Sequence, residues 1–482
     1  MTQTDAARAT RPWSVLGIAS LAAFMVFLDT QVLFIAFDDI RSSFPDVSFA
    51  AMSWTLSAYT IALAAALVPA GRLADRFGRK RTFQFGLVAF TLASALCAAA
   101  SSPALLVAFR VVQALGAAAL VPASLAIVLS VFPAEKVPAA VAIWGAIAAL
   151  AAAVGPTLGG LLVDGWGWRS VFLINLPVGA LALVLSQRSV PESREAAHAR
   201  FPDPIGTVLL AGAMSLLALG IVQSNQWHWG SMRTIGSLVA GVAVLVVFVV
   251  RTLEHPHPAL DLELFGARSF RWANIATAVF TIGFTAMFFA QVLFLTQVWG
   301  FGIVKTGLAM MPGPLVVMVL APYFGKLAGR IGQRSLLVPG GLVYAASGVW
   351  FITVIGTQPH WASEILPGSL LGGLGVALVI PHLTSAAVQG LPADQFGAGA
   401  AVNQAIRQLG ATFGVALTVA LLGAIAPLNA LEHFHRVWWM LVASGVLTSA
   451  AALALPGRAR ATVPAPLLTP DPIPAVPMED VA

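Results

Sequence analysis

The sequence predicts an all-α integral membrane protein built from a duplicated helical bundle. Hydrophobic residues make up 59% of the 482 residues and charged residues only 10%, with a mean hydropathy of +0.88. An ordinary soluble domain carries about 25% charged residues, so this chain has too few to cover a surface that faces water. A short basic segment that occurs twice between apolar stretches indicates the duplication.

The repeated segment is the best single indicator of function. Its first copy, Gly71 to Arg81, reads GRLADRFGRKR, and a degenerate copy from Gly325 to Arg334 reads GKLAGRIGQR. Glycine stands in the second copy where the first has Asp75. Internal duplication is typical of secondary transporters, so the repeat favours a transport function.

The apolar stretches are long enough to cross a membrane many times. A membrane helix needs roughly 20 mainly apolar residues to cross about 30 Å of hydrocarbon. By that criterion the sequence predicts fourteen spans, near residues 13–37, 50–70, 82–101, 103–124, 138–162, 171–188, 205–224, 233–251, 272–298, 307–325, 336–355, 362–386, 398–425 and 436–456. An alternative count merges the seventh and eighth spans into a connector and gives twelve, but their lengths and low charge favour fourteen.

Lysines and arginines predict the orientation of these spans. With the N-terminus inside the cell, 19 of the 26 lie in inner loops and 5 in outer loops, while Arg110 and Arg407 lie within spans. Cytoplasmic loops carry an excess of Lys and Arg, so both termini are expected in the cytoplasm. The net charge of +6 therefore reflects membrane topology and does not indicate a nucleic-acid partner.

The predicted organisation has five parts: a cytoplasmic N-terminus (1–12), an N-terminal half (13–188), a linker with two additional spans (189–271), a C-terminal half (272–456) and a proline-rich cytoplasmic tail (457–482) expected to be disordered. The sequence contains no GxxxxGK[ST] loop for nucleotide phosphates. Transport must then draw on an ion gradient or a substrate gradient.

Asp29 is the only carboxylate placed well inside a predicted span. A charge at membrane depth is costly and therefore a functional candidate. At 1.5 Å per residue Asp29 lies about 12 Å from the outer end of its span, and Arg110 about 10 Å from the outer end of the fourth. We expect the two side chains to meet or to share a water-filled cavity. Proton coupling and a fixed structural ion pair are the alternatives.

A second polar cluster lies in the thirteenth span, where Asn403, Gln404, Arg407 and Gln408 fall within two turns. Asn403 and Arg407 are four residues apart and share one helix face, which must look into the bundle. They are candidates for a substrate cavity, and hydrogen bonding between helices is the alternative. Weaker candidates for the same cavity are Gln113, Trp144 and Gln291.

The fifth span carries Gly155-Pro156-Thr157-Leu158-Gly159-Gly160 near its outer end. Proline bends a helix and glycine permits close helix contact, so this segment suits a hinge or a tight seam. Plain close packing is the alternative.

The sequence shows no apparatus for catalysis. It has no paired carboxylates, nucleophile elbow or HExxH motif, and Cys97 is the single cysteine. The pairs His255/His257 and His433/His435 lack the carboxylates or thiols that would complete a metal site. We therefore expect neither an enzyme nor a cofactor.

These motifs resemble the major facilitator superfamily, and specifically its fourteen-span drug:proton antiporter family. Similar stretches follow one another along nearly the whole chain: Leu28–Thr30 (LDxT), Gly71–Arg81 (GxLaDrxGrkr), Arg110–Gly116 (RxxQGxG, with Ala114 for glycine), Gly155–Gly160 (the antiporter motif, with Ala151 for its upstream glycine), Trp168–Pro177 (WRWxFxINxP) and Asn403–Gly410 (NxxRQxG).

The resemblance implies two six-helix halves with two extra central helices, in the cytoplasmic membrane of a bacterium. It implies that Arg110 takes part in proton coupling, and that the fifth-span motif, with Gly155, Pro156, Gly159 and Gly160, restrains leakage. It implies a gate latch made by Gly71, Asp75, Arg76, Gly78, Arg79 and Lys80. The implied partners are a small-molecule substrate, protons and the lipid bilayer, with no nucleic acid or nucleotide.

One departure concerns the substrate. The family's first span usually continues to an asparagine and a proline, and these positions hold Phe34 and Asp38 here. A polar cavity group is lost, and a single deep carboxylate argues against multivalent cationic drugs.

The predicted function is proton-coupled efflux of hydrophobic or amphipathic compounds by alternating access. The nearest alternative is a dedicated exporter of one endogenous metabolite on the same fold. Uptake is disfavoured by the fifth-span motif. A non-transporting receptor or scaffold, an alternative of another class, is disfavoured because no loop is long enough for a sensory or partner-binding domain.

Overall fold

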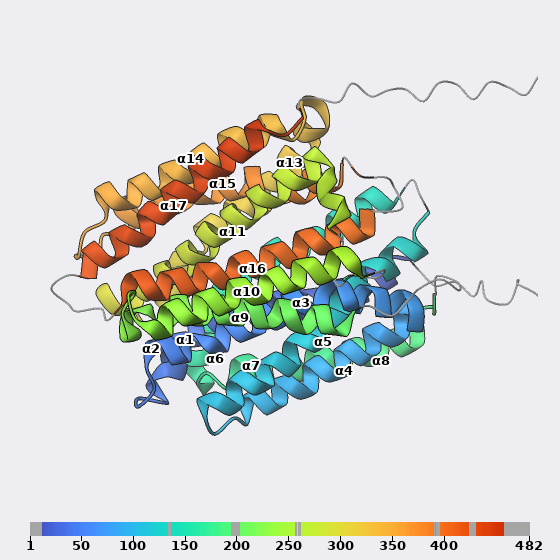
Figure 1. Ribbon diagram of the computed structural model, residues 1–482, viewed down its shortest axis with the longest axis horizontal. Helices are drawn as coiled ribbons and strands as arrows, with labels where there is room; N and C mark the ends of the chain where they lie inside the picture. Colours follow the sequence, from blue (N-terminus) through green and yellow to red (C-terminus); the bar gives the residue numbers. More distant parts are fainter. Residues whose placement is uncertain are drawn as a thin grey trace, which may run out of the picture.

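The computed structural model describes residues 12–133, 136–193, 203–255, 258, 262–389, 391, 396–423 and 430–456. The regular secondary structure of the described residues is all helical, and the long helices run side by side in a single elongated bundle (Figure 1).

Eight helices form the N-terminal half. Their bounds are α1 (Pro12–Ser42), α2 (Phe49–Met52), α3 (Trp54–Phe77), α4 (Arg79–Ala98), α5 (Pro103–Val131), α6 (Val137–Trp166), α7 (Ser170–Leu173) and α8 (Asn175–Ser189). The linker contributes α9 (Pro204–Trp227), α10 (Met232–Glu254) and the short η1 (Glu263–Gly266). The C-terminal half comprises α11 (Arg268–Leu293), the π-helical η2 (Phe294–Val298), α12 (Ile303–Met310), α13 (Pro312–Ile331), α14 (Arg334–Val354), α15 (Trp361–Val388), α16 (Phe396–Leu422) and α17 (Ala430–Leu453).

Thirteen segments of the described chain are long and apolar enough to cross a membrane. The predicted seventh and eighth spans are separate helices of this kind, at Pro204–Ser224 and Met232–Glu254, which disfavours a merged connector. The fifth predicted span is the 30-residue helix α6, several of whose side chains lie outside the described set. The total of fourteen spans stays a prediction.

The two ends of the described chain lie at the same end of the bundle. In Figure 1, α1 begins and α17 finishes at the right-hand end. The connection between α3 and α4, which carries the basic segment, lies at that end too, because α3 runs parallel to α17. This placement agrees with an even number of crossings, while a cytoplasmic location of that end stays a prediction.

The two copies of the basic segment have the same backbone turn. Gly78 has φ +109° and Gly332 has φ +87°, and each amide donates to the carbonyl four residues earlier in the preceding helix. Residues with side chains rarely adopt such positive φ values, so both turns favour glycine. The segment is mostly helical, since α3 continues to Phe77 and α4 starts at Arg79.

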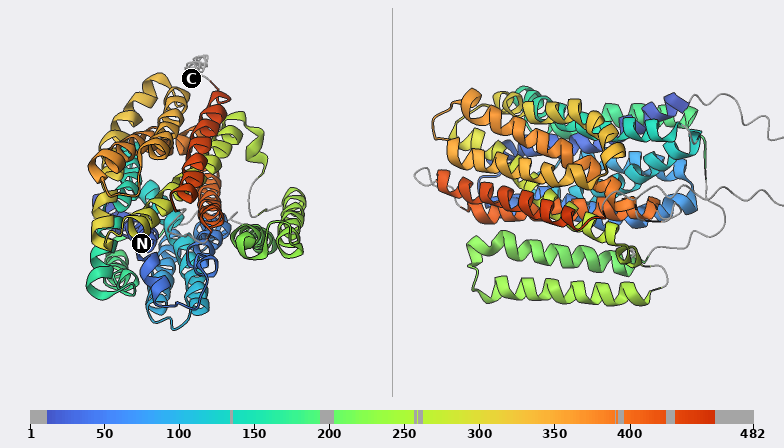
Figure 2. Two further views of the ribbon diagram at one scale, coloured as in Figure 1. Left: turned by 90° about the vertical axis from the view of Figure 1, so that its left-hand side faces the viewer. Right: turned by 90° about the horizontal axis from the view of Figure 1, so that it is seen from above.

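The helices α9 and α10 form a hairpin at the edge of the bundle, visible at the bottom of the right-hand view in Figure 2. α9 packs against α3 and α16, and α10 packs against α9. Asp203 caps α9 and accepts two hydrogen bonds from Arg251, at 2.7 and 2.8 Å. Its hydrogen bond with Arg251 lowers the pKa of the Asp203 carboxyl from its usual value.

The two halves contact each other at the opposite end from the chain termini. Phe34 and Phe37 of α1 pack on Phe289 of α11, and Asp38 accepts hydrogen bonds from Thr296 at 2.7 Å and from Gln297 at 2.9 Å. Asp38 belongs to α1 because this helix continues to Ser42, beyond the predicted end near residue 37. These contacts close the bundle at that end.

Candidate functional site

A buried polar network occupies the centre of the N-terminal half. Its side chains come from α1, α4, α5 and the start of α8, and α3 contributes the Thr55 carbonyl, so five separate segments supply it. Its polar side chains are almost completely shielded, with exposed fractions of 0–2%. The residues are Asp29, Ser94, Arg110, Gln113 and Asn175.

The ion pair between Asp29 and Arg110 is the core of this network. Arg110 Nη1 lies 2.5 Å from Asp29 Oδ2, and both side chains are 1% exposed. The sequence prediction that these two residues meet is therefore confirmed. Arg110 Nη1 also donates to Gln113 Oε1 at 2.7 Å, and Arg110 Nε donates to the Thr55 carbonyl at 3.2 Å. The guanidinium is thus held by a carboxylate and two neutral acceptors.

Two amides complete the environment of the carboxylate. Gln113 Nε2 and Asn175 Nδ2 each donate to Asp29 Oδ1 at 2.9 Å. Both amides also donate to Ser94 Oγ, which in turn donates to the Phe172 carbonyl at 2.9 Å. Both oxygens of Asp29 therefore have donors. Gln113 belongs to this network, and its predicted place in a substrate cavity stays a prediction.

Aromatic rings cover the remaining surface of Arg110. The Arg110 Cζ atom lies 3.9 Å from the centroid of the Tyr59 ring and 5.9 Å from that of Phe172. Cation–π contact stabilises a desolvated guanidinium in addition to its ion pair. The Arg110 guanidinium is consequently paired with a carboxylate and surrounded by a backbone carbonyl, a side-chain amide and aromatic rings.

A second polar network lies in the C-terminal half, around Asn403. Asn403 is fully buried, and its Nδ2 donates to Asn274 Oδ1 and Thr277 Oγ1, both at 2.9 Å. Thr384 Oγ1 of α15 donates to Asn403 Oδ1 at 3.0 Å. These bonds join α11, α15 and α16, so Asn403 fulfils the helix-to-helix bonding that was the alternative to a cavity role.

Arg407 lies one turn beyond Asn403 on the same face of α16, as predicted. Its Nη2 donates to Thr384 Oγ1 at 2.6 Å. Unlike Arg110 it is only partly buried, and no carboxylate of the described residues lies within ion-pair distance. Arg407 is therefore a cation within a membrane span that is oriented by a neutral hydroxyl.

The glycines of α6 form a close seam with both halves. A Cβ atom on Gly155 would lie 2.6 Å from Gln31 Cβ, and one on Gly159 would lie 3.1 Å from Val32 Cα. A Cβ on Gly160 would lie 2.9 Å from the carbonyl oxygen of Ile303 in α12. α6 continues unbroken through Pro156. Residues with larger side chains would push α1 and α12 away from α6.

The first basic segment, Gly71 to Arg81, forms hydrogen bonds with residues outside α3 and α4. The Lys80 amide donates to Glu192 Oε1 at 3.1 Å, its Nζ donates to the Gln187 carbonyl at 3.0 Å, and the Arg79 amide donates to the Ser193 carbonyl at 3.0 Å. Arg72 Nη1 donates to the Pro258 carbonyl at 2.6 Å. The segment thus contacts the chain after α8 and the chain after α10.

The predicted latch residues lie around this turn. Gly71, Asp75 and Arg76 belong to the last turns of α3, Gly78 forms the turn, and Arg79 and Lys80 begin α4. The side chain of Asp75 lies outside the described set, so its predicted partner and its role stay predictions.

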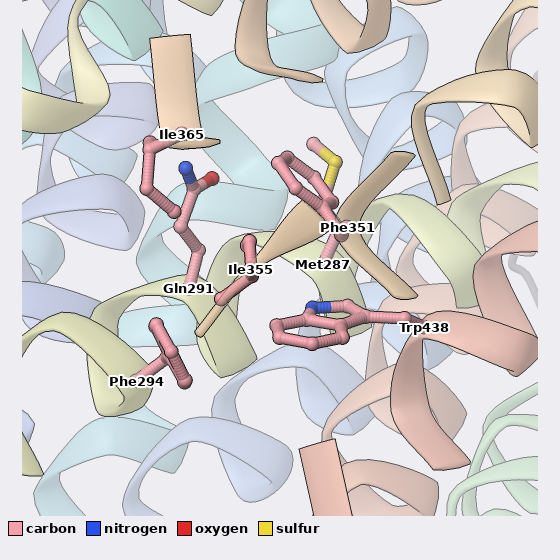
Figure 3. A pocket seen from close by; sticks show the side chains of 7 residues that line it. All are labelled: Met287, Gln291, Phe294, Phe351, Ile355, Ile365 and Trp438. Atoms are coloured by element: carbon pink, nitrogen blue, oxygen red, sulfur yellow. The ribbon is translucent and has the colours of Figure 1, made fainter. Parts of the chain in front are cut away.

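The remaining cavity candidates are held within their own halves. Trp144 Nε1 donates to Ser124 Oγ at 3.1 Å. Gln291 Nε2 donates to Ser369 Oγ at 3.1 Å and borders a small pocket with Met287, Phe294, Phe351, Ile355, Ile365 and Trp438 (Figure 3). A cavity of about 10 Å³ holds about one water, so in this conformation the pocket does not admit a drug-sized molecule.

Comparison with known proteins places the chain in a family. Residues 19–415 match the sequence model of the Major Facilitator Superfamily. The chain belongs to this superfamily. Its fold agrees, because 92% of the chain superposes on a crystal structure of a D-xylose–proton symporter with a TM-score of 0.67 at 16% identity, covering 97% of that chain.

Several relatives carry names of export or resistance proteins. The Multidrug resistance protein Stp of Mycobacterium tuberculosis is 36% identical over 419 residues, which cover 86% of this chain and 77% of the relative. The Tetracenomycin C resistance and export protein of Streptomyces glaucescens is 33% identical, covering 86% and 76%. The Cephamycin export protein CmcT of Amycolatopsis lactamdurans is 30% identical and covers 94% of both chains.

Sequence reasoning missed several members of the two networks as site residues. Asn175 and Ser94 hold the Asp29 carboxylate network, and Thr384 orients Arg407. Asn175 lies within the quoted WRWxFxINxP-like stretch, and its amide within an apolar span was the available signal. A single serine or threonine in an apolar helix gives no such signal, because its hydroxyl commonly bonds to its own helix backbone.

Proposed function

We propose that this chain is a proton-coupled exporter of amphipathic small molecules, a member of the fourteen-span drug:proton antiporter family. The substrate moves outward by alternating access between two conformations. Each conformation closes one end of the bundle and opens the other. The names of its relatives support drug or antibiotic export, and the two-half architecture with a separate α9–α10 hairpin supports the fourteen-span assignment.

The observation that carries this proposal is the buried Asp29–Arg110 pair. A charged pair shielded to 1% exposure in a membrane protein is costly to desolvate, so its retention favours a function beyond stability. Protonation of Asp29 removes the negative partner of Arg110 and weakens a network that joins five helical segments. Proton binding thereby changes the relative free energies of the two conformations.

The contacts between the halves supply the conformational part of the proposal. α1 carries Asp29 near its middle and Phe34, Phe37 and Asp38 toward the closed end, where they contact α11 and η2. A shift of α1 after protonation of Asp29 therefore reaches the contacts that close this end. The Gly155–Gly160 seam prevents leakage while the end is closed, because α1 and α12 approach α6 without intervening side chains.

The test is ethidium accumulation in efflux-deficient cells that express the full chain, with and without a protonophore. We expect low accumulation that rises with the protonophore and in Asp29→Asn. Membrane fractionation checks that the variant is inserted. An Asp29→Asn variant that still exports against a gradient would show that this carboxylate does not couple protons.

A dedicated exporter is the second candidate, favoured by relatives named for one compound, such as tetracenomycin C and cephamycin. Unchanged ethidium accumulation in cells with inserted protein would favour this candidate. Export assays would then turn to metabolites of the host cell.

A further inference from the structure

We propose that Arg407 binds the acidic group of exported compounds, so that amphipathic organic acids are the substrates that this chain binds most tightly. This inference rests on the proposed export function and names the substrate class that the chain recognises. Its basis is the charge balance of the membrane interior.

The interior of the described bundle carries one unmatched positive charge. Of the charged residues that lie deep within spans, Asp29 and Arg110 neutralise each other at 2.5 Å. Arg407 remains, eight residues into the span Gly399–Leu422, with Thr384 Oγ1 as its hydrogen-bond acceptor. Ionisable residues in membrane spans pair with one another or mark the path of a substrate or ion. With no acidic side chain of the described residues within ion-pair distance, Arg407 is suited to an acidic ligand.

The Asn403 network fixes the guanidinium and leaves most of its donors available. Thr384 Oγ1 accepts from Arg407 and donates to Asn403 Oδ1, and Asn403 Nδ2 donates onward to Asn274 and Thr277. Every group in this chain is neutral, so it orients Arg407 without cancelling its charge. A guanidinium has five N–H donors in a planar fork that matches a carboxylate. One donor is used here.

The position of Arg407 suits a substrate site between the halves. Thr412, five residues further along α16, contacts Thr60 of α3 at 2.6 Å between their hydroxyl oxygens. Five residues of helix correspond to about 7.5 Å, so the backbone of Arg407 lies about one and a half helical turns from the contact between the halves. It lies on the side of that contact away from the closed end, and both Arg407 and Thr384 are partly exposed.

Among its described residues, the N-terminal half offers no comparable site for a cationic substrate. Asp29, its deep carboxylate, already accepts from Arg110, Gln113 and Asn175. A cation would have to displace the guanidinium from a fully buried ion pair. An anion needs no such displacement at Arg407, so the charge arrangement favours acids over organic cations.

The test is equilibrium dialysis of purified full-length protein in detergent against matched probes. The probes are rhodamine B, fluorescein and naphthylacetic acid, each compared with its ethyl ester, which lacks the carboxylate charge. We expect at least one acid to bind about tenfold more tightly than its ester, as for one charge-assisted hydrogen-bonded pair.

Three variants test whether Arg407 causes the tighter binding of the acid. Arg407→Gln should abolish the preference, Arg407→Lys should keep part of it, and Arg271→Gln, which removes an exposed arginine of the same half, should keep all of it. The proposal is wrong if no acid binds more tightly than its ester, or if Arg407→Gln binds the acid as the wild type does.

This test is independent of proton coupling, because binding in detergent needs no gradient. Asp29→Asn should leave the preference for the acid over its ester intact. A chain that binds acids through Arg407 yet fails to export would contradict the proposed function alone. A chain that exports ethidium but has no acid preference would contradict this inference alone.

Discussion

Each half of the described bundle has one arginine deep within a candidate span, Arg110 or Arg407, and the surroundings of these two side chains are opposite. Arg110 is fully buried and bonded to a carboxylate, an amide and a carbonyl beneath an aromatic ring. Arg407 is partly exposed and bonded to one hydroxyl. The first arrangement fits an internal charge that is switched by a proton. The second fits a charge that binds an acidic group of the substrate.

The largest expected difference between these arginines is in stability. Arg110→Gln leaves Asp29 as an unpaired buried charge and should destabilise the folded protein by about 3–5 kcal/mol. Arg407→Gln removes an unmatched charge and should change the free energy of unfolding by less than about 1 kcal/mol. Unfolding in mixed micelles with increasing SDS, followed by helicity, measures both.

A double variant sharpens the first of these expectations. Asp29→Asn combined with Arg110→Gln replaces the ion pair by neutral groups and should recover part of the stability lost in Arg110→Gln. Equal loss in the single and double variants would show that the pair is not energetically coupled.

The next effect concerns Asn175, which sequence reasoning did not select. Asn175→Ala removes one donor to the carboxylate and one to Ser94, and should cost about 1.5–3 kcal/mol, the range for hydrogen bonds to charged groups. The same substitution in an Asp29→Asn background should cost clearly less. A cost that is unchanged in that background would assign Asn175 to packing alone.

Much of this site was predictable from the sequence, and the reasons for the limits are physical. Helix rise alone placed Asp29 and Arg110 at matching depths, and helix periodicity placed Asn403 and Arg407 on one face. The partners of these residues come from other helices, and spacing within one helix carries no information about them. Asn175 and Thr384 therefore appeared only in the folded chain, as did the continuation of α1 to Asp38 and its contacts with η2.

The seam between the halves gives a smaller effect on stability and a clear one on transport. Gly160→Val places a branched side chain against the Ile303 carbonyl and should cost about 1–3 kcal/mol by overpacking. The separation of α6 from α12 should make the closed end leak protons. Gly165→Val is the matched control in the same helix, because a Cβ there meets no atom within 4 Å. The rate of proton leak in proteoliposomes distinguishes Gly160→Val from Gly165→Val. Equal leak in both variants would show that the seam does not prevent leakage.

The smallest effect is expected in the α9–α10 hairpin, outside both networks. The Asp203 carboxyl has a lowered pKa in the folded chain, so its bond with Arg251 stabilises the hairpin above the carboxyl's unfolded pKa of about 3.9. That stability is lost as the pH falls through the lower folded value. Asp203→Asn should remove this acid-dependent part and leave export at pH 7 nearly unchanged. Thermal unfolding at several pH values between acidic and neutral measures this contribution to stability. An unfolding temperature that depends on pH in the same way in Asp203→Asn and in the wild type would contradict the prediction.

The most direct test of the division between the halves is substrate counterflow in proteoliposomes, compared with proton-driven uptake into inside-out proteoliposomes. The substrate is an acid probe that binds the wild type. We predict that Asp29→Asn keeps counterflow and loses proton-driven uptake, since it still binds substrate. Arg407→Gln should lose both. Equal loss of both activities in the two variants, or counterflow retained in Arg407→Gln, would contradict the assignment of the proton to one half and the substrate to the other.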